Sequence, residues 1–310
     1  MTVVAASGAR LVCVPFDDWS DHVDPPQGLE VVVWRSGLPW PRRAAEVTFY
    51  VPEYMGPPEA LTALRDLPAL RVVQTLTAGY DDVLAHCPPG LVVCNAAGVH
   101  DASTAELVVG LILASLRGFA DFAEGQRQGE WRHAAHPALA DKRVMIVGAG
   151  SVGRAVADRL APFEVELTMV GRTARAGVEG VDRLPDLLGV ADVVVLTVPL
   201  TAETHRMFDA AALARLRDGA LLVNASRGSV VDTDALLTEL NRGRVSAALD
   251  VTDPEPLPPG HPLWSAPRVV ITPHVGGNTS AFLPRAWALL HDQLARYAAG
   301  SPLRNVVSGG

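Results

Sequence analysis

Three side chains in the second half of the chain have the types needed for acid–base chemistry at a carbonyl group. His274 lies in ITPHVGG, Glu255 in ALDVTDPEPL and Arg227 in NASRGSVVD. A histidine titrates near working pH and can therefore exchange a proton with a substrate oxygen. A carboxylate bound to one ring nitrogen fixes the tautomer and favours the imidazolium, and an arginine holds a carboxylate or polarises a carbonyl through its planar fork. Considered alone, His274 is more typical of a structural histidine than of a catalyst or a metal ligand.

The elements around these residues decide between those interpretations. We predict strands at RVMIV, VELTMV, DVVVLTV, ALLVNAS, VSAALDV and RVVIT, with helices at Val152–Leu160, Asp209–Leu216 and Thr233–Arg242. This alternation predicts a doubly wound Rossmann sheet, which places its chemistry at the carboxyl ends of the strands. Arg227, His274 and a further acid, Asp250, each come at the end of a predicted strand.

A glycine-rich loop follows the first of these strands. VMIVGAGSVGRAVADRL contains G-x-G-x-x-G as Gly148, Gly150 and Gly153, directly after a strand and at the start of a helix. The first glycine permits a tight turn, the second a close approach to a pyrophosphate, and the third close packing of helix on strand. In this context the motif predicts a dinucleotide cofactor, bound at the helix N-terminus.

The end of the next strand bears on which dinucleotide fits. NAD-binding sheets usually carry an acid there for the ribose 2′-hydroxyl, whereas this chain has Gly171, Arg172 and Thr173 in MVGRTAR. An arginine pairs with a 2′-phosphate and a threonine hydroxyl adds a hydrogen bond, so we predict NADP(H), with NAD(H) possible. The alternative is that Arg172 stacks on the adenine or faces solvent. With a nicotinamide, the Arg, Glu and His set predicts carbonyl reduction or its reverse.

The first hundred residues also alternate between strand and helix, at RLVCVPF, LEVVVWR, AEVTFYV, PPEALTALRDL, LRVVQTL and LVVCNAAG. We therefore expect an α/β fold of two doubly wound domains with a cleft between them. The expected domains are a flavodoxin-like substrate domain, residues 1–98 plus 278–310, and a Rossmann coenzyme domain, residues 99–277. The helical tail LPRAWALLHDQLARYAAG is expected to pack back on the first domain.

The stretch from Asp101 to Trp131 is helical in pattern and apolar. Ser103 or Thr104 is expected to cap this helix, with Glu106 in its first turn. So apolar a helix needs cover on most sides, within the fold or from a second subunit, and we expect a homodimer.

Composition excludes several other classes. A net charge of −8 and no Lys/Arg-rich run disfavour nucleic acid as a partner. The longest apolar run, LVVGLILASL, is too short to cross a bilayer, so no membrane association is expected. Cys13, Cys87 and Cys94 form no CxxC pair, and no secretory signal stands at the N-terminus, which together favour the cytoplasm. His133 and His136 have no accompanying ligand set, so no metal is expected and solvated loop positions are favoured.

Nearly the whole chain, from TAGYDD to TPHVGGNT, resembles the D-isomer-specific 2-hydroxyacid dehydrogenase family, which includes glyoxylate/hydroxypyruvate reductases, D-lactate dehydrogenases and phosphoglycerate dehydrogenases. The strongest segments are VGAGSVG, VPLTAETHRMF, LLVNASRGSVVD, ALDVTDPEPLP and TPHVGG. The resemblance implies a catalytic triad of Arg227, Glu255 and His274, and places Asp250 at the nicotinamide side of the cofactor. It also implies that backbone N–H groups of Ala78 and Gly79, in LTAGYDD, hold the substrate carboxylate beside Arg227; the alternative is a plain turn between strand and helix.

The cofactor-binding positions that we predict are Gly148, Gly150, Ser151, Val152, Gly153, Arg172, Thr173, Val198, Pro199, Thr204, Ala225, Ser226, Asp250, His274, Gly276 and Gly277. The sequence given ends soon after the helix near Tyr297, so the appended regulatory domain of many phosphoglycerate dehydrogenases is not expected, and no basic cluster for a substrate phosphate stands near YMGPPEA. A small 2-keto acid such as glyoxylate, hydroxypyruvate or pyruvate is therefore expected. The alternatives are an NAD-linked dehydrogenase of the family on another 2-hydroxy acid, and a cofactor-sensing, corepressor-like binding protein of the same fold.

Overall fold

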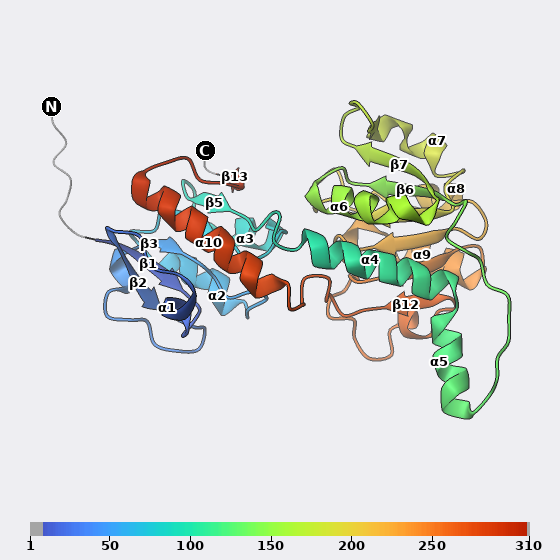
Figure 1. Ribbon diagram of the computed structural model, residues 1–310, viewed down its shortest axis with the longest axis horizontal. Coiled ribbons are helices and arrows are strands. Elements are labelled where there is room, and N and C mark those ends of the chain that lie inside the picture. The colour runs from blue at the N-terminus through green and yellow to red at the C-terminus, as the bar shows by residue number, and fades with distance from the viewer. Residues whose placement is uncertain (1–8, 309–310) are drawn as a thin grey trace. The chain divides into compact units, whose positions relative to one another are not determined.

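The computed structural model describes residues 9–308, which form two compact units. Unit 1 consists of the described residues up to His100 together with those from Ser280 onward, and unit 2 of Asp101–Thr279 (Figure 1). The N-terminal stretch in which no secretory signal was found, and the last two residues of the expected substrate domain, lie outside the described residues.

Unit 2 is built on a seven-stranded sheet in the order β12-β11-β10-β9-β6-β7-β8. Its strands are β6 (Arg143–Val147), β7 (Glu166–Gly171), β8 (Glu179–Gly180), β9 (Val193–Leu196), β10 (Leu221–Asn224), β11 (Ser246–Leu249) and β12 (Val269–Ile271). Every neighbouring pair is parallel. The order reverses at β6, as in a Rossmann sheet, so the predicted fold of this part is confirmed. The two-residue β8 was not predicted.

Both faces of this sheet are buried. Successive side chains of a strand point to opposite faces, so alternate residues join two different core clusters. In β6, Val144 and Ile146 join one core cluster, whereas Met145 and Val147 join the other. In β9, Val193 and Val195 divide from Val194 and Leu196 in the same way. Continuous apolar strands of this kind are typical of parallel sheets with helices on both faces.

The helices of unit 2 are α4 (Asp101–Leu116), α5 (Phe119–Gln128), α6 (Ser151–Leu160), α7 (Leu184–Leu187), α8 (Ala210–Arg215) and α9 (Thr233–Asn241). The predicted cap at Ser103 or Thr104 is wrong, because α4 already begins at Asp101 and both residues lie inside it. Ser103 instead points into the interior and is buried. The helical stretch also breaks at Gly118, whose φ of 67° is left-handed. Beyond it α5 extends away from the sheet (Figure 1).

Unit 1 holds a six-stranded sheet in the order β13-β5-β4-β3-β1-β2. Its strands are β1 (Arg10–Val14), β2 (Leu29–Val33), β3 (Val47–Tyr50), β4 (Val72–Gln74), β5 (Val92–Cys94) and β13 (Val306–Ser308). The first five are parallel, in the order of a flavodoxin-like sheet, and β13 adds an antiparallel edge beside β5.

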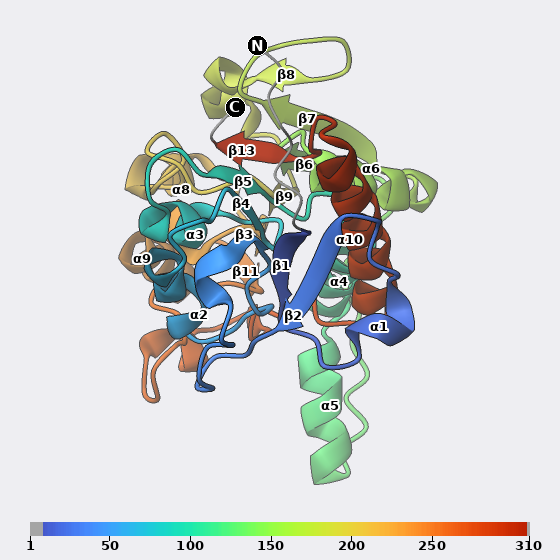
Figure 2. The same ribbon diagram turned by 90° about the vertical axis from the view of Figure 1, so that its left-hand side faces the viewer.

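The helices of unit 1 are α1 (Trp19–His22), α2 (Glu59–Thr62), α3 (Asp81–His86) and α10 (Phe282–Ala299). Figure 2 shows α1 and α10 on one side of the sheet and α2 and α3 on the other. As predicted, the tail helix packs on this unit, through Phe282, Ala286, Trp287, Leu290 and Leu294. Across residues 9–308, no helix combines the length and apolar character needed to cross a membrane.

Candidate active site

Three predicted site residues come directly after three neighbouring strands of unit 2. Arg227 follows β10, Asp250 follows β11 and His274 follows β12. Parallel neighbouring strands end at the same edge of a sheet, so the three residues share the carboxyl edge of β10–β12. This edge is where open α/β sheets bind their ligands.

His274 and Glu255 are in direct contact. His274 Nδ1 lies 2.5 Å from Glu255 Oε1, and both side chains are partly exposed. With Nδ1 bound to a carboxylate, the tautomer is fixed and Nε2 remains as the ring nitrogen that can exchange a proton. This is the arrangement that the sequence predicted for an acid–base histidine.

The electrostatics around Glu255 favour its charged form. Burial alone would raise the pKa of Glu255, but the hydrogen bond from His274 and the positive charges of His274 and Arg227 hold it below its usual value. Arg227 is therefore close enough to act on the carboxylate. A Glu255 that stays ionised can in turn stabilise a protonated His274.

Asp250 organises the loop that carries His274. Its Oδ1 accepts hydrogen bonds from Thr272 Oγ1 at 2.6 Å and the Val275 N–H at 2.9 Å, and its Oδ2 accepts one from the Gly276 N–H at 3.0 Å. Asp250 is only 4 % exposed. The His274 N–H also donates to the Asp250 carbonyl at 2.7 Å, although His274 has a left-handed φ of 52°. These bonds hold a backbone that a non-glycine residue rarely adopts.

The presence of glycine at position 276 is also explained by a contact within the protein. A Cβ at this position would lie 3.0 Å from Asp250 Oδ2, which is tighter than ordinary van der Waals contact. The fit of the loop to Asp250 therefore favours glycine at this position, because a larger residue would push on the Asp250 carboxylate.

Arg227 lies in a turn organised by Asn224, which the sequence reasoning missed. Asn224 Oδ1 accepts from the backbone N–H of Ser226 at 3.1 Å and from its hydroxyl at 2.6 Å, while Asn224 Nδ2 donates to the Arg227 carbonyl at 2.9 Å. Next to it, a Cβ at Gly228 would lie 1.9 Å from the Thr252 carbonyl oxygen. Only glycine lets the Arg227 turn approach the strand end that leads to Glu255.

The glycine-rich loop joins β6 to α6 as predicted. Gly148 has a φ of 121° and packs on Thr197, and a Cβ at Gly153 would lie 1.9 Å from the Gly148 carbonyl oxygen. Both glycines are thus required by the fold itself. Gly150, the residue before α6, differs: a Cβ there would meet nothing within 4 Å. Open space above the free N–H groups of a ten-residue helix fits a bound pyrophosphate.

A pocket of about 320 Å³ opens beside this loop. Of the predicted cofactor residues, its lining includes Gly148, Gly150, Arg172, Val198, Pro199 and Thr204. It also includes Arg175, which the sequence reasoning missed and which donates to the Ala149 carbonyl at 3.1 Å. Glu203 also lines the pocket and was likewise missed. The pKa of its carboxyl is lowered chiefly by a hydrogen bond with Thr201, and the positive charge of Arg172 lowers it further.

The remaining predicted cofactor residues do not line this pocket. Ser151 donates to Asp101 Oδ1 at 3.0 Å, Val152 packs into the core, and Thr173 is exposed just beyond β7. Ala225 and Ser226 follow β10, and Gly277 follows the His274 loop.

Ala78 and Gly79 lie in unit 1, in the loop between β4 and α3. Both are partly exposed, and Asn95 Nδ2 donates to the Ala78 carbonyl at 2.7 Å.

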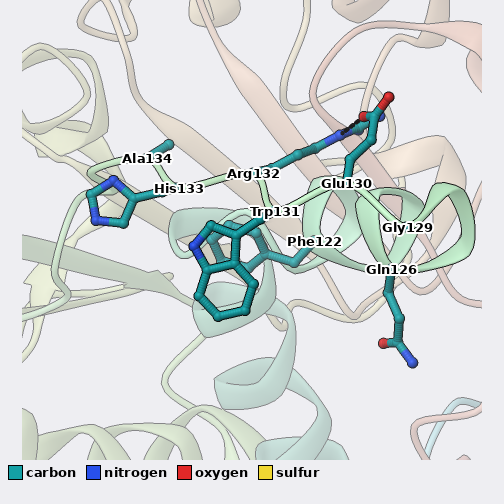
Figure 3. A pocket seen from close by; sticks show the side chains of 8 residues that line it. All are labelled: Phe122, Gln126, Gly129, Glu130, Trp131, Arg132, His133 and Ala134. Carbon is teal, nitrogen blue, oxygen red and sulfur yellow. Dashed lines mark hydrogen bonds and ion pairs between the residues drawn. The ribbon is translucent and has the colours of Figure 1, made fainter.

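A second pocket lies on the arm, the segment 118–138 formed by α5 and the extended chain after it. Its volume is about 570 Å³, and Figure 3 shows Phe122, Trp131 and His133 among the side chains around it. Trp131 is 94 % exposed. His136 packs edge-on against Phe122, with 5.0 Å between ring centroids, so it takes part in packing within the arm. No three His, Cys, Asp or Glu side chains gather as a metal site in the part of the chain that the structure describes.

The site and fold define an NAD(P)-linked oxidoreductase of two α/β units, and comparison with known proteins identifies the family. Residues 109–276 match the model of the D-isomer specific 2-hydroxyacid dehydrogenase NAD binding domain, and the chain belongs to this family. It is 35 % identical over 260 residues to glyoxylate/hydroxypyruvate reductase B of Citrobacter koseri, covering 79 % of this chain and 80 % of the relative.

Two solved structures are similar over nearly their whole length. One is a D-isomer specific 2-hydroxyacid dehydrogenase from Xanthobacter autotrophicus Py2 in complex with NADPH and MES, with a TM-score of 0.82, 31 % identity, and coverage of 98 % of this chain and 99 % of the other. The second is an NADPH-dependent glyoxylate/hydroxypyruvate reductase from Sinorhizobium meliloti in complex with NADP and sulfate. Its TM-score is 0.82 at 28 % identity, covering 96 % of this chain and 98 % of the other.

Proposed function

We propose that this protein reduces small 2-keto acids to D-2-hydroxy acids, with His274 as the acid, Glu255 as its partner and Arg227 as a substrate-binding residue. The observation that carries the proposal is the 2.5 Å contact between His274 and Glu255 at the carboxyl edge of a sheet that also holds a dinucleotide pocket. Family membership supports the same reaction class.

The chemistry divides between cofactor and protein. When bound, the reduced nicotinamide supplies the hydride that reaches the carbonyl carbon. His274 Nε2 gives a proton to the carbonyl oxygen as that oxygen gains negative charge. Glu255 stabilises the imidazolium before the transfer, and the Arg227 guanidinium polarises the carbonyl or holds the carboxylate beside it. In the reverse direction His274 accepts the hydroxyl proton.

The cofactor is NADP(H) in preference to NAD(H). Arg172 and Arg175 line the pocket at the end of β7, and no Asp or Glu stands where a ribose 2′-hydroxyl would be bound. Two guanidinium groups favour a 2′-phosphate. The relatives solved with NADPH or NADP support this preference, and Glu203 across the pocket leaves binding of NAD(H) possible.

The substrate is small and unphosphorylated, of the glyoxylate, hydroxypyruvate or pyruvate type. The names of the relatives support this class. The direct test is oxidation of NADPH and NADH over a panel of 2-keto acids, with chiral analysis of the product. We expect faster turnover with NADPH and a D product. An L product, or turnover of none of these acids, would contradict the proposal.

Two other functions use the same fold. An NAD-linked dehydrogenase acting on another 2-hydroxy acid would favour NADH in the same panel. A corepressor-like sensor would bind the cofactor, measured by calorimetry, without turnover. The assembled His274, Glu255 and Arg227 group favours the enzyme.

We also propose a homodimer formed through the arm. The helix α4, from which the sequence predicted a subunit contact, buries Ala105, Val108 and Ile112 within unit 2. The arm instead exposes Phe119 at 55 % and Trp131 at 94 %. Exposed aromatic groups of this kind are typical of interaction surfaces, and a second copy offers the same surface. Trp131→Ala should produce monomers in light scattering; an unchanged mass would exclude this contact.

The cytoplasmic location stays a prediction. It is supported by Cys13, Cys87 and Cys94, which are all free thiols in the structure.

A further inference from the structure

The loop that contains Ala78 and Gly79 has an ordered row of carbonyl groups. Four consecutive carbonyls, those of residues 76–79, each accept a hydrogen bond from a side chain. The donors are His100 Nε2 to Leu76 at 2.7 Å, Thr75 Oγ1 to Thr77 at 2.9 Å, Asn95 Nδ2 to Ala78 at 2.7 Å and Thr77 Oγ1 to Gly79 at 2.7 Å. Side chains rarely satisfy so many successive carbonyls, because most protein hydrogen bonds join backbone groups.

These bonds also orient the N–H groups of the loop. In a planar trans peptide, the carbonyl and the N–H of the same unit point in opposite directions. The Thr77 carbonyl is bound by Thr75 Oγ1 and by the Ala96 N–H at 2.8 Å, and the Ala78 carbonyl is bound by the neighbouring Asn95. These bonds therefore aim the N–H groups of Ala78 and Gly79 away from their donors. Within residues 9–308, neither N–H group donates to a protein acceptor. Successive free N–H groups that point the same way form an anion-binding concavity.

We propose that Asn95 and Thr75 are positioning residues that aim the N–H groups of Ala78 and Gly79 at the carboxylate of the substrate. The proposal rests on the proposed function, because it takes the 2-keto acid as the anion. It goes further in assigning roles to two side chains that bind the far side of the peptide units and need not touch the substrate.

Asn95 is held so that only its amide nitrogen can face the loop. Its Oδ1 accepts the Ala97 N–H at 3.2 Å, its backbone N–H donates to Asn305 at 3.0 Å, and its carbonyl accepts from Gln74 Nε2 at 3.1 Å. Asn95 is only 7 % exposed, so if its amide N–H were removed, water could not readily donate to the Ala78 carbonyl in its place. An aspartate at this position would put an acceptor against the Ala78 carbonyl.

His100 is a third anchor and supports the start of the loop. Its ring packs against Tyr54, with centroids 5.4 Å apart, and against Phe282, at 5.2 Å, and both pairs are stacked. It is 5 % exposed. The packed ring holds the Leu76 carbonyl in place, which fixes the orientation of the first peptide unit of the loop.

The test compares substitutions that remove one anchor without changing side-chain size. Asn95→Asp should raise KM for the keto acid, and the inhibition constant of oxalate, by about tenfold or more, as expected for losing a charge-assisted hydrogen bond. Thr75→Val should raise both by a smaller factor, because the Ala96 N–H still binds the Thr77 carbonyl. The kcat and the NADPH dissociation constant should change much less. Thr75→Ser, which keeps the hydroxyl, should recover most of the affinity that Thr75→Val loses.

A matched control is Thr48→Val, which removes another hydroxyl bonded to a carbonyl of unit 1, that of Leu11 at 3.1 Å. It should leave KM and oxalate inhibition unchanged. Equal effects of Thr48→Val and Thr75→Val, or lower thermal stability with an unchanged KM in Asn95→Asp, would overturn the proposal and leave a structural role only.

Failure of the proposed function gives a different result. If the natural protein turns over no keto acid, calorimetric titration with oxalate still tests the loop. Binding to the natural protein that is lost in Asn95→Asp would support the positioning role. Equal binding to both proteins, or to neither, would overturn it.

Discussion

At the carboxyl ends of β10, β11 and β12 the polar side chains bind one another, whereas those at β6, β7 and β9 border an open pocket of about 320 Å³. In the first region His274, Glu255 and Asp250 are held by hydrogen bonds before any ligand arrives. In the second region Arg172 and Arg175 are exposed. Proton transfer needs fixed geometry, whereas discrimination between cofactors needs charge near the right atom, so the two regions solve different problems.

The largest effect should come from removing His274, the acid that we propose. His274→Ala is expected to lower kcat by about 10²–10⁴-fold, since a positioned acid contributes on this scale. The dissociation constant of NADPH should change less than about twofold, because the pocket beside the glycine-rich loop remains intact. Steady-state kinetics and fluorescence titration measure the two. As a control, the partly exposed His86 of unit 1 can be changed to Ala, and similar losses in both variants would remove His274 from the chemistry.

The glycine-rich loop offers a matched pair that separates fold from ligand binding. In Gly153→Ala the added methyl group meets the Gly148 carbonyl at 1.9 Å, so we expect a destabilisation of about 1–3 kcal/mol or more. In Gly150→Ala it meets nothing, so thermal stability should hold while NADPH affinity falls about tenfold or more. Normal NADPH binding by a stable Gly150→Ala protein would mean that the open space is not the pyrophosphate site.

Cofactor preference should depend on the two arginines together. Changing Arg172 or Arg175 to Ala is expected to raise KM for NADPH by about tenfold, the scale of one charge-assisted hydrogen bond, with little effect on NADH. Arg183→Ala, at another exposed position of unit 2, serves as the control. If KM rises equally for NADH and NADPH, these residues act on the part that the two cofactors share.

The smallest effect concerns pH. Because the pKa of Glu255 is lowered in the folded protein, its stabilising contribution is complete above the ordinary carboxyl value of 4.5 and is lost as the pH falls through the lowered value. Glu255→Gln should therefore reduce the melting temperature at pH 7, and the difference from the natural protein should shrink below pH 4.5. A difference that stays constant down to the acid transition would show that the charge of Glu255 is not what matters.

Strand periodicity made much of this fold predictable. Apolar runs such as RVMIV and DVVVLTV predicted buried parallel strands. The polar residues at the ends of ALLVNAS, VSAALDV and RVVIT marked the sheet edge, which led to Arg227, Asp250 and His274. The contact between Glu255 and His274, 19 residues apart, followed from their chemistry.

Other residues carried no readable signal. Arg175 reaches the pocket only because the chain turns back at Val178 and adds β8, a strand of two residues. Asn224 stands at the end of a strand, a common place for asparagine. Its hydrogen bonds to Ser226 form only because the chain turns back there, which the sequence does not show. The predicted start of α4 was wrong because serine is a common helix N-cap residue. In the structure the helix begins at Asp101, and tertiary packing buries Ser103 within it.

The two crossings of the chain between the units have a consequence for biosynthesis. Unit 2 is one continuous segment, Asp101–Thr279, whereas the sheet and core of unit 1 require α10 and β13 from the end of the chain. On the ribosome, every residue of unit 2 is therefore made before unit 1 receives the helix that covers one face of its sheet. We expect nascent chains shorter than about 280 residues to leave Val12, Phe49 and Val72 without their α10 partners, and so to depend on chaperones until translation ends.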